Sequence, residues 1–324
     1  MGALIDVRNL VKHFPVKRSL ADVVKGRHLA VHAVDDVSFT LEENESVGLL
    51  GESGCGKTTT GRLLLKLDTP TSGSISIAGQ DLGTIGGAEL KAFRRTAQLV
   101  FQNPFDALNP RFTMRRVLSE PLINAGIDKR EYSDRIAAVL KRVRMQGIGD
   151  LLEKYPHQLS GGQLQRIVLA RALILGPKFI VADEPVSMLD VSVRAGVLNL
   201  MREIQESLRL TAIYISHDLA LVRYVAKRTM VMYLATIVED GPTERVITAP
   251  LHPYTKALIA AVPVPRVDQN RAPLPIKGNL PDARRPPSGC RFHDRCPLAV
   301  QRCSQDIPVL RNVTADHRVA CHLV

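Results

Sequence analysis

The sequence contains no tryptophan, and only 4% of its 324 residues are aromatic. An aromatic-rich platform on which single-stranded bases stack is therefore not expected. Uninterrupted apolar runs are also missing: the longest apolar stretch, residues 164–182, contains Arg166, Arg171 and Lys178. A bilayer-spanning helix needs about 20 apolar residues, so no segment is expected to cross a membrane. The first residues lack the basic and apolar regions of a secretion signal, which favours a cytoplasmic protein.

The sequence does have an excess of positive charge. Lysine and arginine outnumber aspartate and glutamate by 43 to 32, giving a formal net charge of +11. This balance suits an anionic partner such as nucleotide phosphates, nucleic acid or an acidic membrane surface. No block of five or six like charges occurs, so a solvated basic surface explains the excess equally well. Charge alone does not choose between these interpretations.

Short Val- and Ile-rich runs alternate with helical patterns through the first 261 residues. Residues 34–41 alternate with period two, and residues 45–51 and 179–183 form short apolar runs, which predicts three strands. Apolar residues at helical spacing predict an amphipathic helix over 129–145 and a second helix over 161–175. Such alternation is typical of an α/β fold in which helices cover both faces of a mostly parallel sheet.

The composition changes after residue 261. Residues 262–289 hold seven of the 20 prolines, which predicts an extended linker. Four of the five cysteines follow in the segment 290–324. We therefore expect a main domain over 1–261, a proline-rich linker over 262–289 and a cysteine-rich module over 290–324. Clustered cysteines in a reducing compartment favour a metal centre over disulfides.

The strongest motif lies between a predicted strand and a predicted helix, where residues 51–58 fit the phosphate-loop pattern G-x-x-x-x-G-K-[ST]. Backbone N–H groups of such a loop surround the β-phosphate, the lysine contacts the β- and γ-phosphates, and the hydroxyl binds Mg²⁺. The alternative is an ordinary glycine-rich turn, and Cys55 is interpreted as a small packing residue. The expected ATP-binding residues are Gly51, Ser53, Gly54, Cys55, Gly56, Lys57, Thr58 and Thr59.

Two further patterns carry chemistry. Asp183 and Glu184 end an apolar strand, where one carboxylate can hold Mg²⁺ and the next can orient an attacking water. Ser160 precedes Gly161 and Gly162 at a helix start, so its hydroxyl can cap the helix while the free N–H groups meet an anion.

These motifs, with Gln102 in VFQNP and His217 in YISHD, resemble the nucleotide-binding subunit of ATP-binding cassette (ABC) transporters over residues 3 to about 261. The resemblance implies an ABC ATPase with a mostly parallel core sheet, an antiparallel β subdomain and an α-helical subdomain at about 104–176. It also implies catalytic roles for Glu184 as the base, His217 as the γ-phosphate switch and Gln102 as the sensor of Mg²⁺ and water. Thr58, Gln102 and Asp183 are the implied Mg²⁺ ligands.

Other roles follow from the same resemblance. Phe14 is similar to the aromatic residue that stacks on adenine, with His13 or a residue of the basic insert 17–33 as alternatives. Asp190 resembles the aspartate that communicates across a dimer. The family pairs two such chains head to tail, so each ATP lies between one phosphate loop and the signature residues of the partner. In this chain those residues are Ser160, Gly161, Gly162 and Gln163.

Three stretches resemble the oligopeptide and dipeptide importer branch: FPVKR with its basic insert, FQNPFDALNPR, and HPYTKALIAAVP with the cysteine tail. The tail resembles an iron–sulfur module, so Cys290, Cys296, Cys303 and Cys321 are expected to hold a [4Fe–4S] cluster. Zinc is the second interpretation and free thiols the third. Arg291, Arg295 and Arg302 are expected to offset the thiolate charge.

The resemblance implies an energy-coupling ATPase at the cytoplasmic face of the inner membrane, bound peripherally. Its expected partners are a homologous ATPase subunit, two membrane-spanning permeases that contact residues 104–176, and an extracytoplasmic peptide-binding protein. The alternative is a soluble cassette ATPase acting on nucleic acid or ribosomes. Such proteins usually carry two cassettes or a long coiled-coil insertion, and neither is present, so no nucleic-acid partner is expected.

Overall fold

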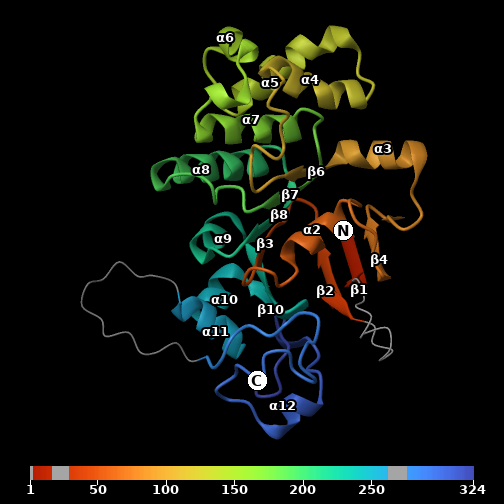
Figure 1. Ribbon diagram of the computed structural model, residues 1–324, viewed down its shortest axis with the longest axis vertical. Coiled ribbons are helices and arrows are strands. Elements are labelled where there is room, and N and C mark those ends of the chain that lie inside the picture. Colours follow the sequence, from red (N-terminus) through yellow and green to blue (C-terminus); the bar gives the residue numbers. More distant parts are fainter. Residues whose placement is uncertain (1–2, 17–28, 262–275) are drawn as a thin grey trace. The chain divides into compact units, whose positions relative to one another are not determined.

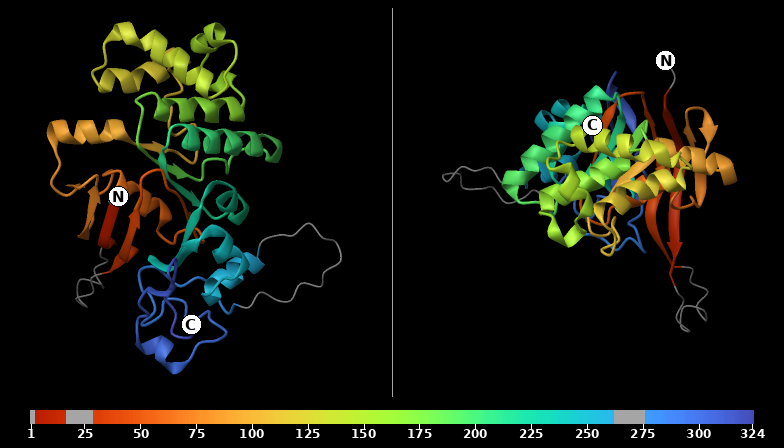
Figure 2. Two further views of the ribbon diagram at one scale, coloured as in Figure 1. Left: turned by 180° about the vertical axis from the view of Figure 1, so that it is seen from behind. Right: turned by 90° about the horizontal axis from the view of Figure 1, so that it is seen from above.

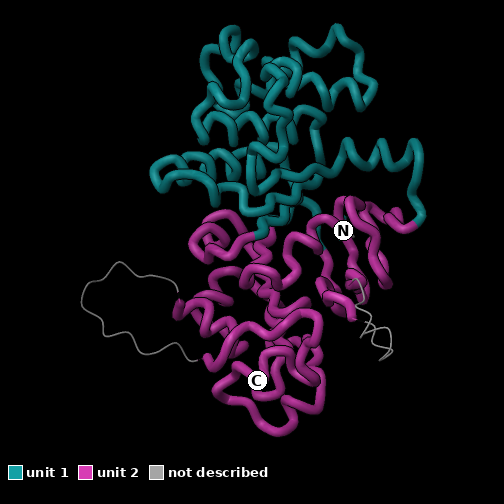
Figure 3. Tube along the Cα trace, viewed as in Figure 1, with its two compact units in different colours: residues 1–4, 41–46, 84–215 teal, residues 5–40, 47–83, 216–324 magenta. Residues whose placement is uncertain are grey.

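The computed structural model describes residues 3–16, 29–261 and 276–324. Most of the basic insert and the first half of the predicted linker therefore lie outside the described residues. The chain divides into two compact units (Figure 3). Unit 1 comprises residues 1–4, 41–46 and 84–215, and unit 2 comprises residues 5–40, 47–83 and 216–324.

Unit 1 is built on parallel strands in the order β8-β7-β6, of which β7 and β8 are buried along their whole length. Apolar residues dominate β7 and β8, as expected for strands covered on both faces. The strands are β6 (Ala97–Val100), β7 (Phe179–Asp183) and β8 (Thr211–Ser216). The helices are α3 (Gly87–Thr96), α4 (Met114–Asn124), α5 (Tyr132–Arg142), α6 (Ile148–Glu153), α7 (Gly161–Leu173) and α8 (Val191–Ser207).

Helices α4, α5, α6 and α7 form a packed group within unit 1 (Figure 1). Figure 2 shows the same group from behind and from above, with α7 beside α8. The helix predicted over 129–145 is shorter than expected. A 3₁₀ turn occupies Lys129–Glu131, and the chain leaves the helix at Arg144, whose φ is +56°. The left-handed backbone there ends the helix although the apolar spacing continues to Val143.

Unit 2 contains two sheets. The first is antiparallel where its register is defined, in the order β2-β1-β4-β5, and corresponds to the expected antiparallel β subdomain. The second has the order β11-β12-β10-β9-β3, in which only β3 and β9 pair in parallel. The first sheet comprises β1 (Ile5–Pro15), β2 (Ala30–Leu41), β4 (Ser72–Ile77) and β5 (Gln80–Asp81). The second comprises β3 (Ser46–Leu50), β9 (Arg228–Tyr233), β10 (Thr236–Pro242), β11 (Arg311–Thr314) and β12 (His317–Val319).

The helices of unit 2 are short. They are α2 (Lys57–Leu64), α9 (Leu219–Val225), α10 (Thr243–Thr248), α11 (Pro253–Ala260) and α12 (Gln301–Gln305). No helix among the described residues has the length and apolar character needed to cross a membrane, in agreement with the sequence.

The cysteine-rich segment 290–324 is part of the second sheet of unit 2. Its strand β12 pairs with β10, and His317 lies 2.8 Å from the carboxylate of Glu239, with both side chains buried. Backbone N–H groups of Leu251 and His252 donate to the same carboxylate. A buried carboxylate with three partners is satisfied, and these contacts fix the segment to the sheet.

Candidate functional site

The phosphate loop connects β3 to α2 in unit 2. Gly56 has a φ of +109°, and a Cβ at this position would lie 2.0 Å from the carbonyl oxygen of Ala33, so only glycine fits. Lys57 is 6% exposed, and its ammonium donates to the carbonyls of Gly51 at 2.7 Å and Glu52 at 2.9 Å. The lysine is thus held inside the loop, as a phosphate-binding lysine requires.

The remaining loop residues divide by exposure. Ser53, Gly54 and Thr58 are exposed, whereas Cys55 is 1% exposed. Burial raises the pKa of the Cys55 thiol more than the nearby Lys57 lowers it. A protonated, buried thiol is a poor nucleophile, so the structure agrees with a packing role for Cys55.

Two of the predicted catalytic residues meet in unit 1. The amide nitrogen of Gln102 lies 3.3 Å from a carboxylate oxygen of Glu184. Glu184 follows β7 directly and has a φ of +44°, a strained conformation for a residue other than glycine. Its N–H donates to the carbonyl of Ile215, which holds this conformation in place. Such strain is typical of functional positions. Asp183, one residue earlier, is 8% exposed.

The signature residues begin α7, also in unit 1. The Ser160 hydroxyl accepts from the N–H of Gln163 at 3.4 Å, and the Gln163 side chain accepts from the N–H of Ser160 at 3.1 Å. This reciprocal cap confirms the capping role predicted for Ser160. A Cβ on Gly162 would lie 2.5 Å from the side chain of Val193, so the loop packs closely against the start of α8. Asp190 is the N-cap residue of α8 and is exposed.

Phe14 lies near the end of β1 and is 38% exposed, with the Lys12 ammonium 4.7 Å from its ring centre. The alternative His13 faces elsewhere: its Nε2 lies 3.3 Å from Asp35, and its ring contacts that of His32. The other alternative, the basic insert, lies mostly outside the described residues. His217, which is exposed, follows β8.

The four tail cysteines are free thiols that gather in unit 2, close enough to influence one another electrostatically. Burial raises the pKa of Cys290 to about 11, and burial also raises the pKa of Cys296 and Cys321. The Leu323 N–H donates to the sulfur of Cys321 at 3.5 Å. Three of the four thiols are therefore harder to ionise than a free cysteine.

The tail cysteines do not form a compact group of three metal ligands in the described part of the chain. Among the described residues, one group of three possible ligands lies within 4.8 Å of one another, and it is His13, His32 and Asp35. No three cysteine sulfurs are therefore that close.

The three arginines expected to offset thiolate charge, Arg291, Arg295 and Arg302, each pair with a carboxylate. Arg302 contacts Asp306, and both are exposed. Arg291 contacts Asp35 at 2.5 Å with both side chains mostly buried. Carboxylates accept hydrogen bonds from guanidinium groups more strongly than protonated thiols do, which explains the pairing.

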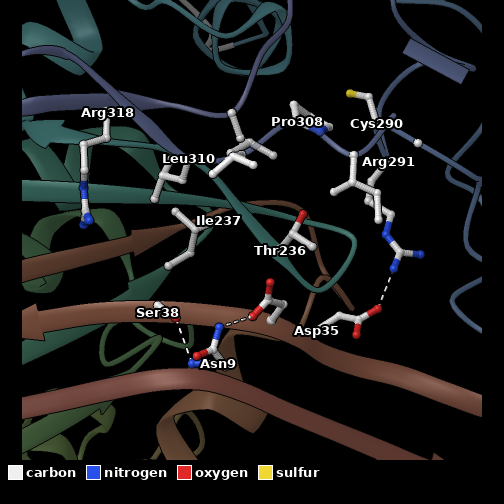
Figure 4. Close-up of a pocket in the computed structure, with 16 residues that line it drawn as sticks. Asn9, Asp35, Ser38, Thr236, Ile237, Cys290, Arg291, Pro308, Leu310 and Arg318 are labelled. Carbon is white, nitrogen blue, oxygen red and sulfur yellow. Dashed lines mark hydrogen bonds and ion pairs between the residues drawn. The ribbon is translucent and has the colours of Figure 1, made fainter. Parts of the chain in front are cut away.

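The third arginine, Arg295, contacts Glu52 of the phosphate loop at 2.9 Å. Sequence reasoning missed this pair because its members lie 243 residues apart and belong to no common motif. It also missed a pocket of about 300 Å³ beside Asp35, Cys290 and Arg291. Figure 4 shows Arg291 reaching Asp35 at this pocket. No phosphate-loop residue lines it, so it is separate from the predicted nucleotide site.

Known proteins resemble this chain in both fold and sequence. Residues 34–187 match the family described as "ABC transporter", and residues 238–303 match the "Oligopeptide/dipeptide transporter, C-terminal region". A dimeric ATP-binding cassette bound to ADP and phosphate in a post-hydrolysis state superposes with a TM-score of 0.64 at 26% identity, covering 74% of this chain and 98% of that one.

Two curated relatives extend the match over the whole chain. The oligopeptide transport ATP-binding protein AppF of Bacillus subtilis is 44% identical over 99% of this chain and 97% of its own length. The di/tripeptide transport ATP-binding protein DppF of Pseudomonas aeruginosa is 43% identical over 99% of this chain and 98% of its own length. These matches confirm the fold and the ATPase expected from the phosphate loop, and the chain belongs to the ATP-hydrolysing subunits of ABC transporters, in the oligopeptide and dipeptide branch.

Proposed function

We propose that this chain drives peptide uptake across the cytoplasmic membrane by ATP-dependent closure of a dimer. The observation that carries the proposal is full-length similarity to peptide transport ATP-binding proteins, including the C-terminal region of that branch. The same similarity favours an importer over an ATPase acting on nucleic acid. In the proposed assembly the chain lies at the inner face of the membrane and is attached only through its partners.

The proposed chemistry follows from the residues. Lys57 and the N–H groups of loop 51–59 bind the ATP phosphates. Thr58, Gln102 and Asp183 supply oxygen ligands, which Mg²⁺ prefers, and Mg²⁺ when bound neutralises phosphate charge. Glu184 holds and deprotonates the attacking water.

Gln102 orients the water-binding carboxylate of Glu184. The 3.3 Å separation of the Gln102 amide nitrogen from a carboxylate oxygen of Glu184 supports this role. His217 contacts the γ-phosphate and Phe14 stacks on adenine. Ser160, Gly161, Gly162 and Gln163 bind the ATP of the partner ATPase subunit, which is a homologous chain in a heterodimer, and Asp190 communicates across that dimer.

The permease contact is proposed for the helical region 104–176. Support comes from a cleft of about 660 Å³ in unit 1, lined by residues 106–112 with Glu120 and Arg171. The exposed Phe105 ring lies beside this stretch in sequence. Apolar and charged groups at the rim of an open cleft suit a helix presented by a membrane protein. An extracytoplasmic binding protein delivers the peptide to the permeases.

The four tail cysteines are proposed to hold a [4Fe–4S] cluster, with zinc as the alternative. Support comes from the gathering of the four cysteines in unit 2 and from the Leu323 N–H donated to the Cys321 sulfur, a contact that stabilises cluster thiolates. Its role is structural, because an ATPase cycle needs no electron transfer. The cluster anchors the segment 290–324.

Co-expression with the two permeases of a peptide importer tests the function. Purification in detergent through a tag on a permease should recover this chain, and the assembly in vesicles should hydrolyse ATP faster when the binding protein and peptide are added. Failure of the tagged permease to recover this chain, together with stimulation of its ATPase by nucleic acid instead of peptide, would contradict the proposal.

A further inference from the structure

Arg295 joins the cysteine-rich segment to the phosphate loop. Its side chain is 8% exposed, and two of its nitrogens contact the two carboxylate oxygens of Glu52 at 2.9 and 3.1 Å. A two-point contact of this kind fixes both the position and the orientation of a carboxylate. Glu52 is the second residue of the phosphate loop, and Arg295 directly precedes Cys296.

Aromatic residues surround this ion pair. The guanidinium lies 5.7 Å from the ring centre of Tyr233 and 5.9 Å from that of Phe292. Burial lowers the pKa of Arg295, but hydrogen bonds to Glu52 and Tyr233 outweigh it and raise the pKa, so the arginine stays charged. The hydroxyl of Tyr254, packed on the same rings, accepts from the Glu52 N–H at 2.9 Å. Glu52 is therefore held at its side chain and its backbone.

The contacts continue to the phosphate-binding lysine. The carbonyl of Glu52 accepts from the Lys57 ammonium at 2.9 Å, so the residue fixed by Arg295 is one of those that hold that ammonium. The Glu52 carboxylate also belongs to a loop built to bind an anion. Without Arg295 its negative charge would repel the incoming phosphates.

We propose that Arg295 is a positioning residue for nucleotide binding, so that the cysteine-rich segment sets the affinity of the phosphate loop for ATP. Arg295 orders the loop through Glu52 before ATP arrives, which removes an ordering cost from binding, and it cancels the carboxylate charge. The inference rests on the proposed role of the phosphate loop.

The test measures ATP binding by the full-length chain with Mg²⁺, using calorimetry. Arg295→Met keeps the side-chain length and removes the charge. It should raise the Kd for ATP roughly tenfold, the loss expected for one charge-assisted contact. Arg302→Met is the matched control, because Arg302 also directly precedes a cysteine but pairs with the exposed Asp306. It should leave the Kd unchanged.

A double variant separates loop positioning from simple loss of stability. Glu52→Gln combined with Arg295→Met removes the unpaired carboxylate and should bind ATP more tightly than Arg295→Met alone. A general loosening of the tail would give no such recovery, since the arginine is absent from both proteins. Arg295→Lys retains the charge without the two-point contact, and its Kd should lie between those of wild type and Arg295→Met.

The outcomes are distinguishable. Unchanged ATP affinity in Arg295→Met, or no recovery in the double variant, overturns the inference while leaving the phosphate loop in place if Lys57→Ala abolishes binding. Normal binding by Lys57→Ala overturns the proposed loop function itself. If Arg295→Met does not fold, the Kd of Arg295→Lys decides. A Kd above the wild-type value supports the inference, and an unchanged Kd overturns it.

Discussion

The phosphate-binding lysine and the cysteine-rich segment are held in opposite ways. Lys57 is held by its own loop, because it donates to carbonyls only five and six residues away. The segment 290–324 is held by distant residues, with Arg291 paired across 256 positions and His317 across 78. A locally encoded structure can be recognised from a short motif. A structure encoded in two distant places becomes visible only when the chain is folded.

The largest effect is expected from a change to the phosphate-binding lysine, which is held by nearby residues. Lys57→Ala removes the charge that contacts the β- and γ-phosphates, so ATP binding and turnover should both be lost. Calorimetry with ATP and a phosphate-release assay check the two losses. Thr69, a residue outside the motif that follows α2, provides a substitution control, Thr69→Ala, that should bind ATP normally. Normal ATP affinity in Lys57→Ala would contradict the phosphate-loop assignment.

Glu184→Gln sharpens the assignment by separating binding from chemistry. The amide keeps the shape of the side chain but cannot accept a proton, so hydrolysis should fall by about 10²-fold or more while ATP still binds. Turnover and ATP affinity are measured on the same preparation. A variant that hydrolyses ATP near the wild-type rate would show that Glu184 is not the base.

Single Cys→Ser replacements test the cysteine-rich segment. Four cysteines that share one cluster act as a unit, so changing Cys290, Cys296, Cys303 or Cys321 should bleach the brown colour of anaerobically purified protein to a similar degree. Cys55→Ser is the control and should keep the colour. Iron, sulfide and zinc analysis accompanies the spectra. One zinc per colourless chain would replace the cluster with the zinc alternative, and protein without metal would exclude both.

A smaller effect is expected from Asp240 of β10, which pairs with Arg228 and with Arg318 of β12. Burial raises the pKa of Asp240, but the two arginines outweigh it and lower the pKa. Such a carboxyl stabilises the fold above its unfolded pKa, and this contribution is lost as the pH falls through the lower folded pKa.

The free energy of unfolding should therefore decline below about pH 4 in the wild type and less steeply in Asp240→Asn. Asp306→Asn, which removes an exposed ion pair, should give a profile close to the wild type. Denaturant unfolding at a series of pH values measures both. Equal slopes for Asp240→Asn and the wild type would show that this carboxyl does not attach β12.

Sequence reasoning predicted most of what is encoded locally. The strand, loop and helix around Lys57 and the cap formed by Ser160 and Gln163 depend on neighbouring residues, and the structure contains them. The end of α5 was misplaced, because apolar spacing does not reveal the left-handed backbone at Arg144. The partners of Arg291 and Arg295 were also missed, since spacing in the tail carries no information about Asp35 or Glu52.

The pairing of β12 with β10 has a consequence for synthesis of the protein. Asp240 and Arg318 are 78 residues apart, so β10 presents an open edge on the ribosome until β12 has been made and has left the exit tunnel. Exposed strand edges recruit other chains, and contacts of long sequence separation form slowly. During this interval the nascent chain is vulnerable to aggregation, and a chain interrupted between the two strands would retain that open edge permanently.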